Sequence, residues 1–105
     1  METQIKFRFI EDPGHGWLEV PAAVSRSVGV RPEQYSPYSY SFKPGFGGDE
    51  ILYLEEDCDA GVFVRAWEKK HGPIAPRVVN VHEEVSTIRP LPHLDGREYN
   101  REARS

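Results

Sequence analysis

Hydrophobic and polar residues alternate over residues 4–10, which is the arrangement of a β-strand with one buried face. Apolar side chains at every second position share one side of such a strand, because successive side chains point to opposite faces. A run with Pro and Gly follows at 11–14, and extended sequence resumes at 17–20. Residues 4–20 therefore predict a β-hairpin.

Two segments carry apolar residues at helical spacing. The first spans 21–28; Pro suits its first turn and Gly29 is placed to end it. A longer helix is predicted to begin at Asp57 or Asp59, since short carboxylates accept hydrogen bonds from the free N–H groups of a helix start. It runs to about Lys70, and its apolar positions form one buried side.

Three further strands are predicted at 38–42, 50–56 and 78–85. The element order is then β-β-α-β-β-α-β, and most connections are too short for parallel crossovers. We therefore expect an α+β fold, a small and mainly antiparallel sheet with two helices on one face. Seven residues are expected in its core: Phe7, Phe9, Trp17, Leu52, Leu54, Phe63 and Trp67.

A chain of 105 residues fits a single compact domain, which we place at 1–88. From Ser86 onward the sequence becomes polar and rich in Arg, with two prolines. Few apolar side chains are available there to offset the entropy of ordering the chain. Residues 89–105 therefore predict a flexible, weakly ordered C-terminal tail.

Composition narrows the classes of function. Thirteen Lys and Arg oppose seventeen Asp and Glu, a formal net charge of −4 that disfavours general nucleic-acid binding. No apolar run reaches the length of about 18 residues needed to span a bilayer, and the N-terminus lacks a signal-peptide pattern. The single cysteine, Cys58, fits a reducing compartment. We therefore expect a cytoplasmic protein with no membrane partner.

The strongest local feature is acidic. Six acidic residues and no basic residue lie between Asp49 and Asp59. The simplest interpretation is a strand end and a helix start, where Asp57 or Asp59 is structural. In a second interpretation Glu55 and Glu56 are at least partly available to a basic protein partner. A cation site is a third, weaker interpretation, because the spacing does not match an EF-hand.

His15 and Cys58 are the candidate reactive side chains. His15 lies between two glycines and could serve as a general acid or base, but the sequence shows no partner to orient it. Cys58 has neighbouring carboxylates that oppose thiolate formation, so we expect it to pack against the sheet. No metal or cofactor is expected; the weak alternative is a metal held by His15, Asp57 and Asp59.

A Tyr-rich segment offers a further candidate surface. Tyr35, Tyr38 and Tyr40 are interleaved with serines, a composition that suits recognition surfaces. The same rings could instead cover one face of the sheet. Both interpretations stay open at the level of sequence.

Three strings in the chain look familiar: GHGWLEV at 14–20, YSY at 38–40 and YLEEDCDA at 53–60. Together they resemble a family of small, mostly uncharacterised proteins from bacterial, prophage and phage genomes. The resemblance spans roughly residues 5–70 and implies no catalytic or binding residue. It does imply a context, in which small acidic proteins of mobile elements bind host machinery such as defence components.

We therefore expect a non-enzymatic binding protein that contacts a partner through its acidic and Tyr-rich surface. The alternative is a small enzyme or metal-binding protein that uses His15 with carboxylates of residues 55–59. These alternatives differ in geometry, because the second requires His15 and those carboxylates to converge in one pocket.

Overall fold

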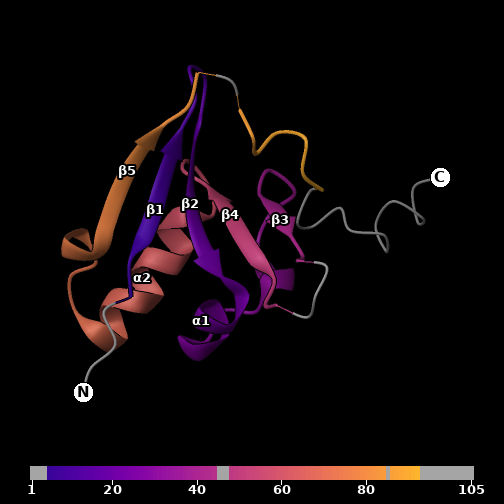
Figure 1. Cartoon of the computed structure of the whole chain (residues 1–105). Helices are drawn as coiled ribbons and strands as arrows, with labels where there is room; N and C mark the ends of the chain where they lie inside the picture. The colour runs from indigo at the N-terminus through magenta and orange to yellow at the C-terminus, as the bar shows by residue number, and fades with distance from the viewer. Residues whose placement is uncertain (1–4, 45–47, 85, 93–105) are drawn as a thin grey trace.

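The computed structural model describes residues 5–44, 48–84 and 86–92 and contains a five-stranded sheet in the order β3-β4-β2-β1-β5 (Figure 1). β1 and β5 are parallel, whereas the other three neighbouring pairs are antiparallel. The predicted α+β fold with a mainly antiparallel sheet is confirmed. The strands are β1 (Phe7–Glu11), β2 (Gly16–Pro21), β3 (Tyr40–Phe42), β4 (Ile51–Glu55) and β5 (Val78–His82).

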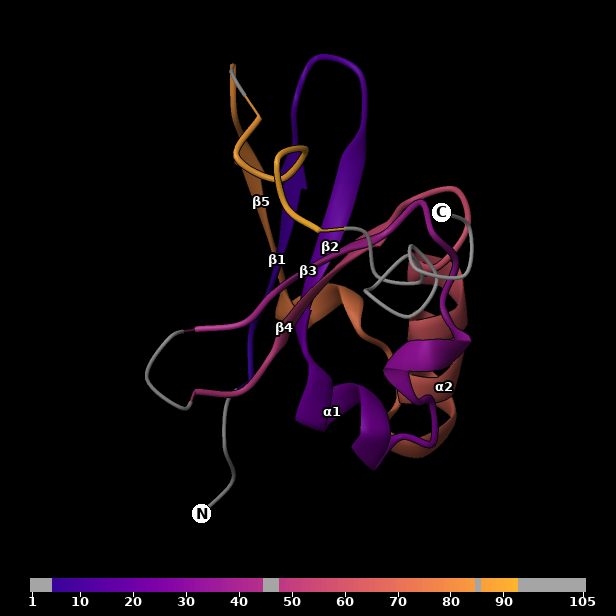
Figure 2. The same ribbon diagram turned by 90° about the vertical axis from the view of Figure 1, so that its right-hand side faces the viewer.

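Two helices, α1 (Ala22–Ser27) and α2 (Ala60–His71), lie on one side of the sheet (Figure 2). Each is followed by a glycine with positive φ, 91° at Gly29 and 89° at Gly72. Only glycine adopts this conformation without steric cost, which explains why each helix ends there. None of the described helices is long and apolar enough to cross a membrane.

The main core lies between the helices and the sheet. The ring of Phe7 packs edge-on against Phe63 and Trp67, with centroid separations of 5.4 and 5.1 Å. Leu52 and Leu54 of β4 complete the predicted set on this face and are fully buried. The alternation of apolar residues therefore identified the strand faces correctly.

Six of the seven residues predicted in the core are buried, and Phe9 is the exception. Phe9 is only partly buried and packs at the margin of the main core. Trp17 is buried, but on the face of the sheet that the helices leave open. There it joins a second apolar cluster with Ile10, Tyr53 and Ile88. The sheet thus has apolar side chains on both faces.

Residues 86–92 cross this second face. Ile88 is 2% exposed, Leu91 packs against the same cluster, and the backbone N–H of Ser41 donates to the carbonyl of Pro92. Residues 89–92, which the sequence assigns to the tail, therefore contact the sheet and the first hairpin. Residues 93–105 of the predicted tail lie outside the described residues.

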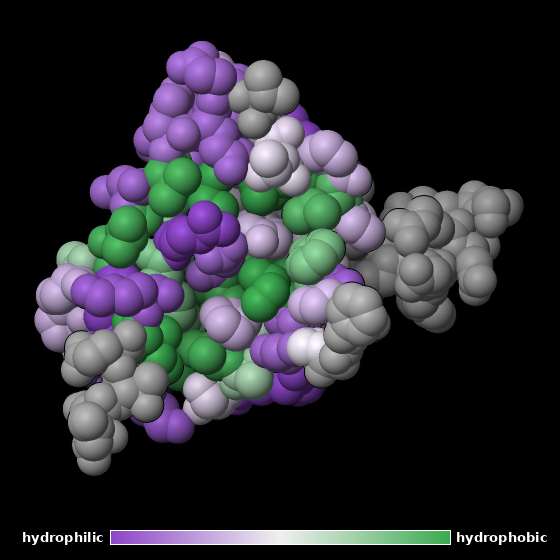
Figure 3. Space-filling view, viewed as in Figure 1, coloured by the Kyte–Doolittle hydropathy of each residue, from purple (hydrophilic) through white to green (hydrophobic). Residues whose placement is uncertain are grey.

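Figure 3 shows this open face of the molecule, where hydrophobic residues surround a polar group. An ion pair between Arg8 and Glu19, joined at 2.7 Å, lies on it. The hydroxyl of Tyr53 also donates to Glu19. Polar side chains therefore interrupt the apolar surface on the side that the helices do not cover.

Candidate functional site

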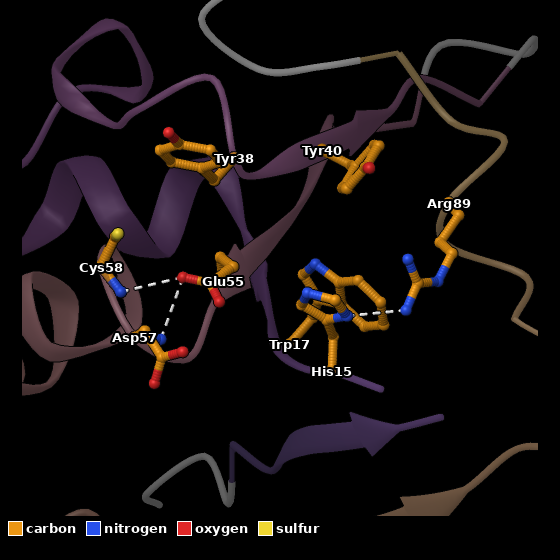
Figure 4. A pocket seen from close by; sticks show the side chains of 8 residues that line it. All are labelled: His15, Trp17, Tyr38, Tyr40, Glu55, Asp57, Cys58 and Arg89. Carbon is orange, nitrogen blue, oxygen red and sulfur yellow. Dashed lines mark hydrogen bonds between the residues drawn. The ribbon is translucent and has the colours of Figure 1, made fainter. Parts of the chain in front are cut away.

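A pocket of about 300 Å³ opens where β2 begins and β4 ends. β2 and β4 pair in a register that sets Trp17 opposite Glu55, so the sheet places an indole beside a carboxylate. Figure 4 shows the side chains that surround this pocket. They are His15, Trp17, Tyr38, Tyr40, Glu55, Asp57, Cys58 and Arg89.

One side of the pocket is aromatic. The rings of His15 and Trp17 stack with their centroids 5.9 Å apart and their planes 23° from parallel. The rings of Tyr40 and Trp17 pack in a T-shaped arrangement, with their centroids 6.1 Å apart. Tyr38, which is 64% exposed, lies at the rim (Figure 4). The predicted residues Tyr38 and Tyr40 are therefore brought together with the Trp-containing turn.

The third predicted tyrosine is elsewhere. Tyr35 is 2% exposed and lies in the main core. Its hydroxyl lies 2.7 Å from Ser25 Oγ, which itself donates to the carbonyl of Val30, so the tyrosine is the donor. Burial raises the pKa of Tyr35 to about 12. Tyr35 therefore offers no surface to a partner, because its ring is buried in the core and its hydroxyl contacts Ser25 of α1.

The opposite side of the pocket is acidic. Glu55 is 7% exposed, and its Oε1 accepts hydrogen bonds from the backbone N–H groups of Asp57 and Cys58 at 3.0 and 2.9 Å. Asp57 and Glu56 are exposed. Glu55 is buried because β4 stays regular through this residue and the chain bends only after it. Glu55 still lines the pocket, whereas Glu56 lies on the surface beside Gly16.

Cys58 was expected to pack against the sheet. It is instead exposed at the wall of the pocket. Partial desolvation raises the pKa of its thiol, and a hydrogen bond to Glu55 and the charges of Glu55, Asp59 and Asp57 raise it further. The thiol therefore stays neutral at neutral pH. Nucleophilic thiolates need the opposite electrostatic environment.

Asp59 holds the Tyr-rich loop in place. It occupies the N-cap position of α2, but its side chain makes no hydrogen bond to the helix start. It accepts instead from the backbone N–H and hydroxyl of Ser36 and from the hydroxyl of Ser39. Ser39 Oγ in turn accepts from the N–H of Glu55 at 2.9 Å. Asp59 is therefore structural, as expected, but it acts on the loop that carries Tyr38.

The turn between β1 and β2 positions His15. Oδ1 of Asp12 accepts from the N–H groups of Gly14 and His15, at 2.8 Å each. A Cβ at Gly16 would lie 2.6 Å from the ring of Phe9, so only glycine fits there. Gly16 is needed because the ring of Phe9 packs too close to leave room for a side chain. Its backbone angles do not require glycine.

Arg89 was missed by the sequence analysis because it lies in the predicted tail. Its guanidinium donates to both carboxylate oxygens of Asp12, at 2.8 and 3.2 Å, and to Nδ1 of His15 at 2.6 Å. It also lies 5.6 Å from the centre of the Trp17 ring. Arg89 and the N–H groups of the turn hold the pKa of Asp12 well below its usual range. No local sequence signal distinguishes Arg89 from its neighbouring arginines.

Two ring N–H groups at the pocket have no acceptor within the described part of the chain. Arginine can only donate, so Nδ1 of His15 is the acceptor and a neutral imidazole carries its proton on Nε2. That Nε2–H makes no described hydrogen bond, and neither does the buried Nε1–H of Trp17. The indole of Trp17 is buried, as is the equally unpaired indole of Trp67 in the main core, whereas His15 is exposed and its Nε2–H is open to a ligand or to solvent.

The convergence required by the enzyme alternative is met in part. His15, Glu55 and Asp57 line one pocket, whereas Asp59 is held by the serines of the Tyr-rich loop. Over residues 5–44, 48–84 and 86–92, no group of three or more His, Cys, Asp or Glu is placed to hold a metal ion. The proposed metal set of His15, Asp57 and Asp59 is therefore not brought together.

Comparison with known proteins adds no relative to this picture. No family model, curated protein or solved structure matches the chain.

Proposed function

We propose that this chain is a non-enzymatic binding protein whose partner is a basic protein. The partner docks on what we call the pocket surface, formed by Tyr38, Tyr40, Glu55, Glu56 and Asp57. The observation that carries the proposal is that aromatic rings and carboxylates line the same pocket. Aromatic side chains supply contact area in protein interfaces, and complementary charge accelerates association.

The balance of charge at the pocket favours a cationic partner. Arg89 is the cation in the lining, and Asp12 neutralises it through a two-point ion pair. Glu55 and Asp57 in the lining make no ion pair with the cations of the described residues, and Glu56 lies close by. The remaining charge is therefore negative, and it attracts positively charged groups before contact.

The family resemblance supports a more specific context. It favours a protein of a phage or prophage that acts in the cytoplasm on a host protein, for example a defence component. Mobile-element proteins of this size can act by occupying a surface, without catalysis. The partner would then be found among basic host proteins.

Acid–base catalysis is the second candidate, since His15 shares the pocket with Glu55 and Asp57. The contact of His15 with Arg89 argues against it. Nδ1 of His15 already accepts a hydrogen bond from the guanidinium of Arg89 at 2.6 Å. That nitrogen is therefore occupied and is not open to take a proton from a substrate.

Affinity capture from a host lysate tests the proposal. The bait variant Glu56→Gln/Asp57→Asn removes two exposed charges at the pocket surface. The control Glu33→Gln/Glu84→Gln removes two exposed charges elsewhere. We expect one or a few basic proteins, identified by mass spectrometry, with the natural chain and the control but not with the pocket variant. Equal recovery by all three baits would reject the pocket surface as the interface.

A further inference from the structure

We propose that the pocket recognises an arginine side chain of the partner, together with the carbonyl oxygen of a peptide group next to it. This inference rests on the proposed function and adds the chemical group that is bound. A guanidinium is planar, stacks on aromatic rings and forms paired hydrogen bonds with carboxylates. The pocket supplies both elements: the exposed Tyr38 is a ring that is free to stack, and Glu55 and Asp57 are the carboxylates.

The chain itself shows how a guanidinium is held at this place. Arg89 lies over the Trp17 ring at 5.6 Å while Asp12 binds it at two points. An incoming arginine would find the same combination, an aromatic ring and a carboxylate, on the other side of the pocket. Figure 4 shows Glu55 and Asp57 on that side, across from Arg89.

The unpaired donors distinguish a peptide from a simple cation. Nε2–H of the exposed His15 is free to donate to a ligand, and a cation offers it no acceptor, whereas the unpaired Nε1–H of Trp17 is buried. A peptide carbonyl is a strong acceptor and is always present next to an arginine side chain. The two rings that carry these donors are stacked (Figure 4). An arginine within a peptide therefore matches both the carboxylates of the pocket and the free imidazole donor of His15.

The size of the pocket agrees with a single anchoring residue. A volume of about 300 Å³ lies at the lower end of ligand sites. It accommodates one long side chain and its peptide group, and no folded segment. Binding energy in interfaces is often concentrated in one such anchor, and arginine is among the residues enriched there.

The test is a titration of the ¹⁵N-labelled protein with three acetylated, amidated tripeptides of sequence Gly-X-Gly. X is arginine, lysine or citrulline, which has nearly the shape of arginine without its charge. The indole N–H signal of Trp17 reports on the pocket, and that of Trp67, which lies in the main core, is the internal control. The variant Trp17→Phe assigns the two signals.

We expect the arginine peptide to move the Trp17 indole signal saturably and to leave the Trp67 signal in place. Its affinity should exceed that of the citrulline peptide at least tenfold and should also exceed that of the lysine peptide. Asp57→Asn should weaken binding severalfold, whereas Glu33→Gln, an exposed change away from the pocket, should not. Amide spectra of both variants verify that they are folded.

Equal binding of the arginine and citrulline peptides would overturn the inference, as would a Trp17 signal that does not respond to arginine. Equal binding of the lysine peptide would reject the preference for a guanidinium. If the arginine peptide fails but capture of a basic protein still depends on Glu56 and Asp57, the inference falls and the proposed function stands. If that dependence is also missing, both fall.

Discussion

Asp12 illustrates how one buried carboxylate can order a functional turn. Its side chain is 2% exposed and accepts hydrogen bonds from two backbone N–H groups and from Arg89. These contacts fix the positions of His15 and Arg89, which lie 74 residues apart in the chain. The geometry of the pocket therefore depends on a residue that does not line it.

Replacing Asp12 by Asn should lower the free energy of unfolding by about 1–3 kcal/mol at pH 7, because an amide satisfies fewer of these donors. The pKa of Asp12 is depressed in the folded chain, whereas an unfolded Asp titrates at about 3.9. Its stabilising effect is therefore complete above that value and is lost as the pH falls below it. The variant should lose less stability than the natural chain between pH 6 and pH 3.

Urea unfolding at several pH values measures both effects. Glu11→Gln is the matched control, since Glu11 is exposed and adjacent. If the Asn variant shows the same pH dependence as the natural chain, the bond between Asp12 and Arg89 does not contribute to stability in solution.

The sequence predicted several of the pocket residues but not how they meet. His15, Tyr38 and Asp57 were identified because His, Tyr and Asp carry chemistry or contact area. Trp17 was expected only in the core, because its side chain is large and mostly apolar. Its place at the pocket follows from its position opposite Glu55 in the sheet. That pairing is a property of strand register, which a single sequence specifies only indirectly.

At the scale of elements, the Tyr-rich loop and the start of α2 form one unit. Asp59 binds Ser36 and Ser39, and Ser39 binds the backbone of Glu55 at the end of β4. Tyr38 lies between the two serines. The position of its ring at the pocket therefore depends on a carboxylate that does not line the pocket.

Asp59→Asn should destabilise the protein by about 1–3 kcal/mol, because the amide cannot accept all three hydrogen bonds that the carboxylate receives. The aromatic signals of Tyr38 and Tyr40 should also shift. Asp57, two residues away, has an exposed side chain. Asp57→Asn should therefore alter the free energy of unfolding by less than about 0.5 kcal/mol. Melting curves and proton spectra of the two variants make the comparison, and equal melting temperatures would argue against this role of Asp59.

Elements with clear periodicity were predicted closely. α1, β4 and β5 all lie within the ranges expected from the pattern of apolar positions. The sequence placed the N-cap at Asp57 or Asp59; Asp59 occupies it, but its side chain bonds to a loop 20 residues earlier in the chain and not to the helix start. Capping rules describe local hydrogen bonds, and here a tertiary contact takes their place.

At the scale of the whole molecule, residues 86–92 cover part of a face that the helices leave open. The polar composition of the C-terminal region concealed this, because few contacts dock the segment: the buried Ile88, the ion pair of Arg89 with Asp12, and the hydrogen bond from Ser41 to Pro92. These contacts join the segment to strands far from it in the sequence. Composition over a short window does not report such long-range contacts.

Two truncated chains test this docking. A chain that ends at Glu84 loses Ile88 and Arg89, so Trp17 becomes exposed and the amide signals of β1 and β2 should shift. A chain that ends at Pro92 retains these contacts and should keep the same amide signals in β1 and β2 as the full chain. Tryptophan fluorescence and amide spectra distinguish them; nearly identical spectra for the chain ending at Glu84 would show that the segment does not dock.

The central claim is that negative charge at the pocket surface directs a basic partner to it. The most direct measurement is the association rate constant of the captured partner at two ionic strengths. For Glu56→Gln/Asp57→Asn we expect association to slow by about threefold or more at low salt and to depend less on salt. Glu33→Gln/Glu84→Gln should retain the rate and the salt dependence of the natural chain. Equal rate constants and equal salt dependence for the two double variants would contradict the account.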